Sequence, residues 1–196
     1  MPPPITVLMA VFNGEAFLPT AIESILDQSY SDFRFLVVDD QSTDGTRELV
    51  RSYSDTRIDL VCLEQNVGQT AALAIGLDQI QSPWVARMDA DDYAAPTRFE
   101  QQMALLDSDQ SLGCVGTWAW TFSENHRMPK VLLIRPETHP VIAKVLLWDS
   151  PLIHGSMIAS REAMVRAGGY DRSYRYSADW DLYDRLFLEC RAANVP

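Results

Sequence analysis

The segment Val37-Val38-Asp39-Asp40-Gln41-Ser42-Thr43-Asp44-Gly45-Thr46 is the most informative about the fold of this 196-residue chain. The apolar run that leads into it, from Phe33 to Val38, is typical of a buried strand and ends abruptly at two aspartates. The Ser, Thr, Asp and Gly residues that follow favour turns and helix N-caps, so a helix is predicted from there to about Tyr53. A buried strand, a short polar turn and a helix form the repeating unit of a parallel α/β sheet.

The same unit repeats through the first half of the chain. Further strands are predicted over residues 5–12, 58–63 and 84–88, and helices over 16–28, 68–80 and 96–106. After residue 110 the alternation loosens, with strands predicted over 112–122, 131–134 and 155–159 and helices over 140–148 and 178–192. This alternation predicts an α/β fold with a doubly wound, mainly parallel sheet flanked by helices. No repeat, linker or low-complexity segment divides the sequence, so we expect a single domain over residues 1–196.

Composition excludes several classes of protein. Hydrophobic residues make up 47% of the chain and charged residues 22%, which rules out wholesale disorder. The 16 Lys and Arg residues against 27 Asp and Glu leave a formal charge of −11, so nucleic acid is not an expected partner. An acidic protein that handles an anionic substrate needs help, most simply from a divalent cation.

Two further features concern the compartment. No apolar run reaches membrane-spanning length and the first residues do not resemble a signal peptide, so we expect neither a transmembrane segment nor secretion. Cys62, Cys114 and Cys190 are odd in number, far apart and set among apolar neighbours. This spacing predicts three buried free thiols in a reducing compartment rather than a disulfide framework or a zinc site.

Acidic clusters follow two of the predicted strands, where parallel α/β sheets bind their ligands. In Asp89-Ala90-Asp91-Asp92, three carboxylates in four residues repel one another unless a cation sits among them. Oxygen ligands suit Mg²⁺ or Mn²⁺ shared with substrate phosphates, and a solvated turn that caps the next helix is an equal alternative. A carboxylate of Asp39-Asp40 can accept a hydrogen bond from a base imide or a ribose, although the pair alone favours an Asx turn or an N-cap.

Two later segments are candidates for the reacting end of a site. Asp179 and Asp181 open the last predicted helix, where they either complement the helix dipole or supply a general base. His154-Gly155-Ser156 is a polar patch in an apolar stretch, and its glycine permits close approach of the backbone to another group. A structural histidine is the alternative, and the sequence shows neither a Ser-His-Asp context nor a GxGxxG or P-loop motif.

Taken together, these segments resemble the family 2 glycosyltransferases of the GT-A fold. Eight blocks match in family order: Val7–Asn13, Ser24–Tyr30, Val37–Thr46, Asn66–Gly68, Asp89–Asp92, His154–Ser156, Gly168–Asp171 and Ala178–Leu182. The resemblance implies an inverting transferase that uses a nucleotide sugar. Residues 1–110 would form the nucleotide-sugar-binding half and residues 111–196 the acceptor-binding half, with further acceptor-binding or membrane-associating parts outside residues 1–196.

The resemblance also implies roles for individual residues. Phe12 would pack on the base, Asp40 would read the base imide, and Asp179 would be the catalytic base. Contacts to the nucleotide sugar are implied at Ala10, Phe12, Asp39, Asp40, Asn66, Gly68, Asp89, Ala90 and Asp91. The metal, Mn²⁺ or Mg²⁺, is implied at Asp89, Asp91 and Asp92, and the acceptor side at His154, Gly155 and Trp180. Ala178 departs from the family, in which many members carry Glu before the base.

The implied partners are a nucleotide sugar and a glycan or lipid-linked acceptor, in polysaccharide biosynthesis for the cell envelope. A UDP-sugar is favoured because uracil has an imide N–H, and guanine stays open. The implied location is the cytoplasm, and a location at the cytoplasmic face of the membrane stays open. Three alternatives stay open: a non-catalytic or truncated sugar-nucleotide-binding module, a nucleotidyltransferase and a structural α/β domain. The nucleotidyltransferase is disfavoured because no Gly/Lys/Arg-rich loop follows the first predicted strand.

Overall fold

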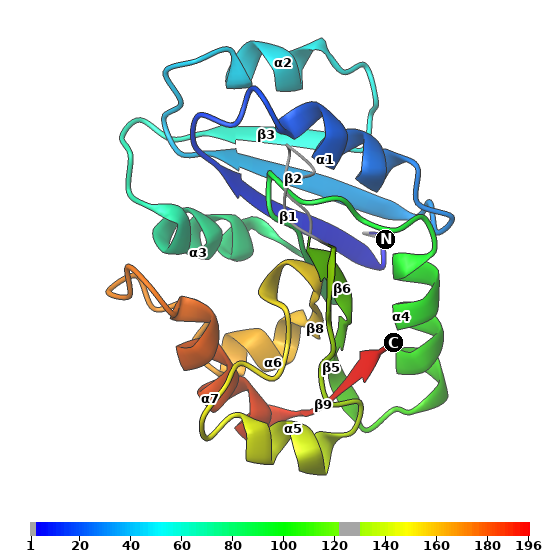
Figure 1. Ribbon diagram of the computed structural model, residues 1–196. Helices are drawn as coiled ribbons and strands as arrows, with labels where there is room; N and C mark the ends of the chain where they lie inside the picture. Colours follow the sequence, from blue (N-terminus) through cyan, green and yellow to red (C-terminus); the bar gives the residue numbers. More distant parts are fainter. Residues whose placement is uncertain (1–2, 122–129) are drawn as a thin grey trace.

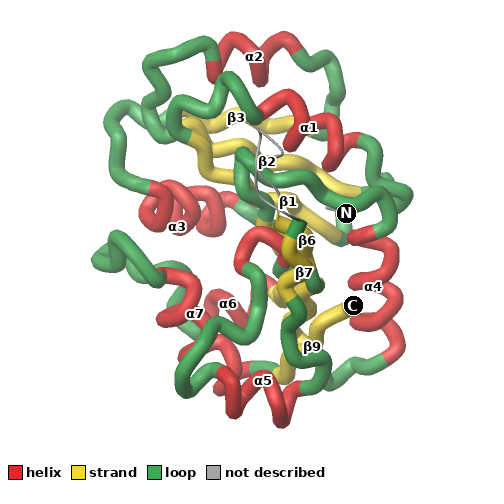
Figure 2. The backbone as a smooth tube through the Cα atoms, viewed as in Figure 1, coloured by secondary structure: helices red, strands yellow, loops and turns green. Residues whose placement is uncertain are grey.

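The structure, a computed structural model, describes residues 3–121 and 130–196. Its strands are β1 Ile5–Val11, β2 Phe33–Asp39, β3 Ile58–Cys62, β4 Trp84–Arg87, β5 Leu112–Thr117, β6 Ala119–Thr121, β7 Val131–Leu133, β8 Ile158–Ser160 and β9 Arg191–Val195 (Figure 1). Its helices are α1 Leu18–Leu26, α2 Thr46–Ser52, α3 Gln69–Gln79, α4 Arg98–Ser108, α5 His139–Val145, α6 Arg161–Arg166 and α7 Ala178–Glu189 (Figure 2). A short 3₁₀ turn, η1, spans His154–Ser156.

Seven strands form one sheet in the order β3-β2-β1-β4-β8-β5-β9, and β6 pairs with β7 in a separate ribbon. Strand β1 is parallel to β2 and β4, β2 is parallel to β3, and β5 is parallel to β9. Strand β8 runs antiparallel to both of its neighbours, β4 and β5. The predicted mainly parallel α/β sheet is confirmed, with this one antiparallel strand between its two parallel parts.

The sheet is buried on both faces because its side chains alternate between two cores. From β1, Leu8 and Ala10 pack in the core that includes side chains of α3, α5, α6 and α7. Val7 and Met9 point to the opposite face, into the core that includes side chains of α1, α2 and α4. A strand covered on both faces reads as a continuous apolar run, which is why the strands of the first half are visible in the sequence.

The sequence prediction is wrong at the end of the chain, where the helix expected over 178–192 ends at Glu189. The next residues form β9, which pairs with β5 from Leu112 to Thr117. Local periodicity did not reveal this strand because Arg191, Ala192 and Ala193 are good helix formers and read as a continuation of the helix. Ala192 and Ala193 are buried there, and a Cβ on Gly113 would lie 2.4 Å from the Cβ of Cys190, so the close approach requires glycine.

Smaller differences occur in the second half. The strand predicted over 112–122 divides into β5 and β6 at Trp118, and its last residue lies outside the described residues. The strand predicted over 155–159 is η1 followed by β8. All three cysteines are free, but Cys114 alone is buried and the other two are partly exposed, which corrects the expectation of three buried thiols. Within the described residues, no helix combines the length and apolar character needed to cross a membrane.

The fold brings the ends of β1, β2 and β4 together and sets η1 beside them. Gln102 of α4 fixes η1, because its side-chain amide donates to the carbonyls of Val115 (2.7 Å) and Ser156 (2.8 Å). Arg98, one turn earlier on the same helix, donates to the Arg87 carbonyl at 2.7 Å. The two buried side chains therefore tie α4 to β4, β5 and η1 directly behind the acidic segment 89–92.

Candidate functional site

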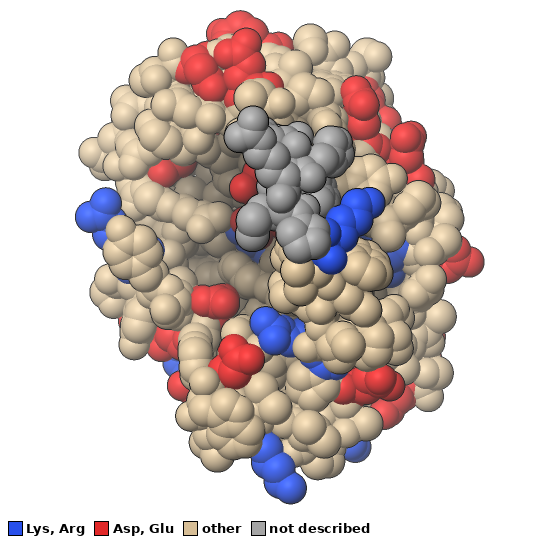
Figure 3. Space-filling model, in the orientation of Figure 1, with Lys and Arg blue, Asp and Glu red and all other residues tan. Residues whose placement is uncertain are grey.

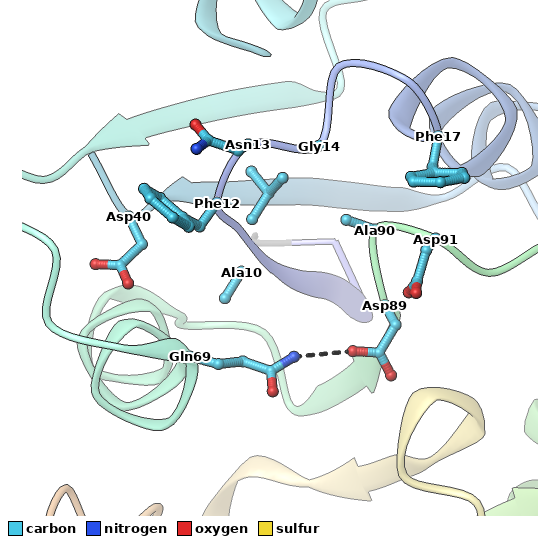
Figure 4. Close-up of a pocket in the computed structure, with 11 residues that line it drawn as sticks. Ala10, Phe12, Asn13, Gly14, Phe17, Asp40, Gln69, Asp89, Ala90 and Asp91 are labelled. Carbon is cyan, nitrogen blue, oxygen red and sulfur yellow. Dashed lines mark hydrogen bonds between the residues drawn. The ribbon is translucent and has the colours of Figure 1, made fainter. Parts of the chain in front are cut away.

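A cavity of about 350 Å³ lies at the carboxyl ends of β1, β2 and β4. It is lined by Ala10, Val11, Phe12, Asn13, Gly14, Phe17, Asp40, Gln69, Asp89, Ala90 and Asp91 (Figure 4). The space-filling view shows this face hollowed, with acidic atoms inside the hollow (Figure 3). The site therefore lies where ligands bind in parallel α/β sheets. Six of the residues predicted to contact the nucleotide sugar line it, whereas Asp39, Asn66 and Gly68 do not.

One end of the cavity is built around Asp40. Its side chain is buried, and its two oxygens accept backbone N–H bonds from Val67 (2.7 Å) and Gly68 (2.8 Å). Gly68 has a φ of 87°, which favours glycine, and the Asn66 side chain donates to the Asp40 carbonyl at 3.0 Å. The loop 66–68 thus holds Asp40 from outside the cavity. Each carboxylate oxygen keeps acceptor capacity for an N–H of a ligand.

An exposed aromatic side chain stands beside that carboxylate. Phe12 is 51% exposed at the end of β1, and it lies next to Asp40 in the cavity (Figure 4). Phe17, 42% exposed, lies on the other side of the cavity, near Ala90 and Asp91 (Figure 4). A large apolar ring left in water beside a polar group is a surface on which a flat base can pack.

Asp39 faces away from this cavity. It is completely buried, forms an ion pair with Arg47 of α2, and accepts the backbone N–H of Ser42 at 3.2 Å. These contacts build the turn between β2 and α2. Any effect of Asp39 on a bound nucleoside would therefore be indirect, through the position of Asp40.

The other end of the cavity is the acidic segment after β4. Oδ1 of Asp89 accepts hydrogen bonds from the Arg87 guanidinium at 2.6 Å and from the Gln69 amide at 3.1 Å (Figure 4). Oδ2 of Asp89 lies 2.8 Å from the point where a Cβ on Gly155 would be, and Oδ2 of Asp92 lies 2.7 Å from the same point. Gly155 is thus what lets η1 approach two carboxylates at once.

The charges of this segment are only partly balanced. Burial works to raise the pKa of Asp89, but the charge and hydrogen bond of Arg87 bring it below its ordinary value. The pKa of Asp92 is raised, first by burial and then by the negative charges of Asp89 and Asp91. A cation near these oxygens would relieve that repulsion.

The donor set fits a divalent ion that a ligand helps to hold. Within residues 3–121 and 130–196, no group of three or more His, Cys, Asp or Glu side chains is close enough to hold a metal alone. Carboxylate oxygens from Asp89 and Asp92 are hard ligands of the kind that Mg²⁺ and Mn²⁺ take. Mg²⁺ is commonly held by one or two carboxylates together with substrate phosphates and water.

A hydrogen-bonded pair, the partly buried His154 and the buried Tyr170, lies between the acidic segment and the second half of the chain. Nε2 of His154 is 2.9 Å from the Tyr170 hydroxyl. Burial, and then the charge of Arg87, lower the pKa of His154 to about 3, so the ring is neutral at pH 7. Burial raises the pKa of Tyr170, and the charges of both Asp89 and Asp179 add to that rise. The pair therefore lies within electrostatic reach of the cavity and of the start of α7.

The predicted acceptor-side residues on α7 differ in their surroundings. Asp179 is half-buried in the first turn and has no side-chain partner in the described part of the chain. Asp181, two residues later, pairs with Arg185. The Trp180 indole donates to the Leu146 carbonyl at 3.1 Å and packs against the core, so it anchors α7 to the end of α5.

Sequence reasoning missed five residues that line the cavity, Val11, Asn13, Gly14, Phe17 and Gln69, and also Arg87, which holds Asp89. Phe17 and Gln69 lie at helix starts next to predicted site loops, a position that carries no distinctive pattern. Arg87 did carry a signal, because it is a charged residue within the apolar run 84–88 that leads into the acidic segment. A charge inside a buried strand calls for a buried partner.

Comparisons with known proteins agree with this geometry. The family model described as Glycosyl transferase family 2 matches residues 6–169. The O-antigen biosynthesis glycosyltransferase WbnJ of Escherichia coli is 30% identical over 191 residues, which cover 95% of this chain and 72% of WbnJ. Four curated relatives that the chain matches are longer, and it spans 63% to 72% of their lengths.

Two solved structures share the fold. Staphylococcus aureus TarS 1-349 in complex with UDP-GlcNAc has a TM-score of 0.80 at 19% identity, over 97% of this chain and 55% of that one. The mannosyltransferase PcManGT from Pyrobaculum calidifontis, in complex with GDP-Man and Mn²⁺, has a TM-score of 0.75 at 23% identity, over 100% of this chain and 55% of that one.

Proposed function

This chain belongs to glycosyl transferase family 2, and we propose that it moves a sugar from a nucleoside diphosphate sugar to an acceptor hydroxyl with inversion. The proposal rests on one observation, which is that the two ends of the cavity differ in their chemistry. Asp40 and the exposed ring of Phe12 stand at one end, and the carboxylates of Asp89 and Asp91 stand at the other, where Asp92 also approaches Asp89 beside Gly155. A nucleoside diphosphate has the same two ends, a flat base with N–H donors and an anionic diphosphate.

The nucleoside end supports a UDP-sugar. Asp40 accepts hydrogen bonds and cannot donate when it is ionised, so it suits the imide N–H of uracil. The exposed ring of Phe12, which lies beside Asp40, would pack on the base ring. The solved TarS complex holds UDP-GlcNAc, and the PcManGT complex holds GDP-Man, so both base classes occur among proteins of this fold. The comparison of UDP with GDP is therefore part of the test below.

At the diphosphate end, Asp89 and Asp92 would hold Mn²⁺ or Mg²⁺ together with the phosphate oxygens, and Asp91, which lines the cavity, would face the same ligand. When bound, the cation would neutralise negative charge that develops on the departing diphosphate. Arg87 and Gln69 hold Asp89 in place, and Gly155 gives the carboxylates room. Mn²⁺ in the PcManGT complex supports the choice of metal class.

We assign the general base to Asp179. Its carboxylate would take the proton of the acceptor hydroxyl as that oxygen forms a bond to the anomeric carbon. The bond from the anomeric carbon to the diphosphate oxygen breaks at the same time, and the nucleoside diphosphate leaves with the electron pair. One base and one direct displacement invert the anomeric centre, whereas retaining glycosidases use two carboxylates in two displacements.

The acceptor is proposed to be a glycan or a lipid-linked sugar of the cell envelope. WbnJ, which acts in O-antigen biosynthesis, supports this class. His154 and Gly155 line the approach between the acidic segment and α7, and Trp180 supports it from the core side. Parts of the longer relatives beyond the matched region would add to acceptor or membrane binding.

A ligand screen tests the proposed function. We expect UDP and UDP-sugars to raise the melting temperature more than GDP does, and we expect Mn²⁺ to increase the effect, since ligands that bind the folded state raise its stability. Turnover is then measured with the same donors and a panel of acceptors. Binding without transfer or donor hydrolysis, in this chain and in a longer one, would support the non-catalytic module instead. The absence of any nucleotide effect would reject both.

A further inference from the structure

Arg87 is an arginine buried in the sheet, directly before the acidic segment. Its side chain is 1% exposed, in the last position of β4. One nitrogen, Nη2, lies 2.6 Å from Oδ1 of Asp89, Nη1 donates to the Met88 carbonyl, and Nε has no partner among the described residues. A buried guanidinium with an unpartnered N–H destabilises the folded state. This cost indicates that Arg87 has a function in the site.

The contacts of Asp89 indicate what that role is. Arg87 and Gln69 both donate to Oδ1, one from the interior and one from the start of α3. Oδ2 is left facing the point beside Gly155 that Oδ2 of Asp92 also faces. Oδ2 of Asp89 lies 2.8 Å from that point and Oδ2 of Asp92 lies 2.7 Å from it. The distance between the two oxygens cannot exceed the sum of these two distances, so the oxygens are close neighbours.

Arg87 also changes the charge that a cation meets. Three carboxylates would otherwise stand in four residues, and the Arg87 guanidinium offsets one of them from behind. A cation at the two Oδ2 atoms then needs more negative ligands, and the diphosphate of a bound donor supplies them.

We propose that Arg87 is a positioning residue that fixes Asp89 with Oδ1 turned inward and Oδ2 turned toward Asp92, and so couples cation binding to the binding of the nucleoside diphosphate. The inference rests on the proposed function, because it concerns the cation of that site. It differs from a purely structural role of Arg87, which would affect the melting temperature but not the coupling between metal and nucleotide.

The coupling is measured as a ratio. The Kd of UDP is determined by calorimetry in saturating Mn²⁺ and in EDTA, and the ratio of the two values is the Mn²⁺ enhancement. For the unmodified chain we expect an enhancement of about 10-fold or more, within the usual range of coupling between two ligands. For Arg87→Met we expect the enhancement to fall to about 2-fold or less, with the Kd in EDTA within about 2-fold of the unmodified value.

Two further variants keep the test decisive if Arg87→Met does not fold. Gln69 is exposed and donates to the same oxygen, so Gln69→Leu is expected to fold normally and to lose part of the enhancement. Arg34→Met is the matched control. It removes a different arginine–aspartate pair, Arg34 with Asp59, at the opposite end of the sheet strands, and it should leave the enhancement unchanged.

The outcomes separate the two levels of the proposal. An unmodified enhancement in Arg87→Met and in Gln69→Leu would overturn the positioning role. A chain that binds UDP equally with and without Mn²⁺ would instead remove the cation from the proposed function, and with it this role of Arg87. A chain that binds no nucleotide would contradict the proposed function itself before any variant is measured.

Discussion

The carboxylates of the cavity at the ends of β1, β2 and β4 are held differently from the carboxylate at the start of α7. Asp40 is gripped by two backbone N–H groups, and Asp89 by a guanidinium and an amide. Asp179 has no side-chain partner within the described residues, although Asp181 in the same turn is paired with Arg185. Fixed acceptors suit recognition of a ligand, whereas a carboxylate whose lone pairs are open suits the capture of a proton.

The surrounding sheet shows the same contrast. The cavity lies on parallel strands, and the loops that follow these strands meet at its rim. The second half contains the antiparallel β8, the turn η1 and helices that depend on contacts distant in the sequence. The first half is therefore built from one repeated strand–helix unit, and the side assigned to the acceptor is more irregular.

The largest expected effect is the loss of sugar transfer in a variant of Asp179, the carboxylate at the start of α7. Asp179→Asn removes the proposed base but keeps the shape of the side chain, so we expect transfer to fall by about 10³-fold. The Kd of UDP with Mn²⁺ should stay within about 2-fold, because the proposed nucleotide site contains the other group of carboxylates. Asp181→Asn is the matched control, and its transfer rate should stay close to normal. Transfer at the normal rate in Asp179→Asn would show that the base is another group.

The next effect tests the approach of η1 to the acidic segment. In Gly155→Ala the new Cβ would lie 2.7 Å and 2.8 Å from oxygens of Asp92 and Asp89, so one or both must move. We expect the Kd of UDP measured with Mn²⁺ to rise by about 10-fold or more, while the Kd in EDTA stays nearly constant. Equal losses under both conditions would indicate a general disturbance of the cavity instead.

A smaller effect is expected at the nucleoside end. Asp40→Asn turns one acceptor into an amide that faces backbone donors, so the loop 66–68 is disturbed and the hydrogen bond proposed to the base is lost. We expect UDP to bind about 10-fold more weakly both with and without Mn²⁺. Asp59→Asn, in β3 and away from the cavity, serves as the control. A change confined to the Mn²⁺ condition would contradict the assignment of Asp40 to the nucleoside end.

The smallest effect concerns stability and pH. The pKa of His154 is about 3 in the folded chain against an ordinary 6.5, so between these values the unfolded state binds a proton that the folded state does not. The contribution of His154 to the free energy of unfolding is therefore complete above pH 6.5 and is lost as the pH falls. We expect His154→Gln to reduce the slope of unfolding free energy against pH in this window by up to ~1.4 kcal/mol per pH unit, measured by denaturant titration. Identical slopes would show that the ring is already accessible to protons.

The first half of the molecule was well predicted from the sequence because its strands are buried on both faces and its loops carry turn residues. The acidic clusters fell at the ends of β2 and β4 as expected, and Asp40, Asp89 and Asp91 line one cavity. The family resemblance implied Asp40 as the residue that faces the ligand, but the residue types alone do not show which of the two aspartates does so. In extended backbone, adjacent side chains point to opposite sides. One points to Arg47 in the interior and the other to the cavity.

Short stretches of sequence were enough to predict the strand–helix order of the first half, the positions of the acidic clusters and the family resemblance, because each depends on residues close together in the chain. Features that depend on distant partners became visible only in the folded chain. β9 exists because β5 accepts it, and Gly155 matters because it meets Asp89 and Asp92. In the sequence, Arg87 is an unexplained charge within an apolar run. In the folded chain, its guanidinium donates to one oxygen of Asp89. The physical reason is that a side chain's chemistry is set by its neighbours in space, which the order of residues alone does not specify.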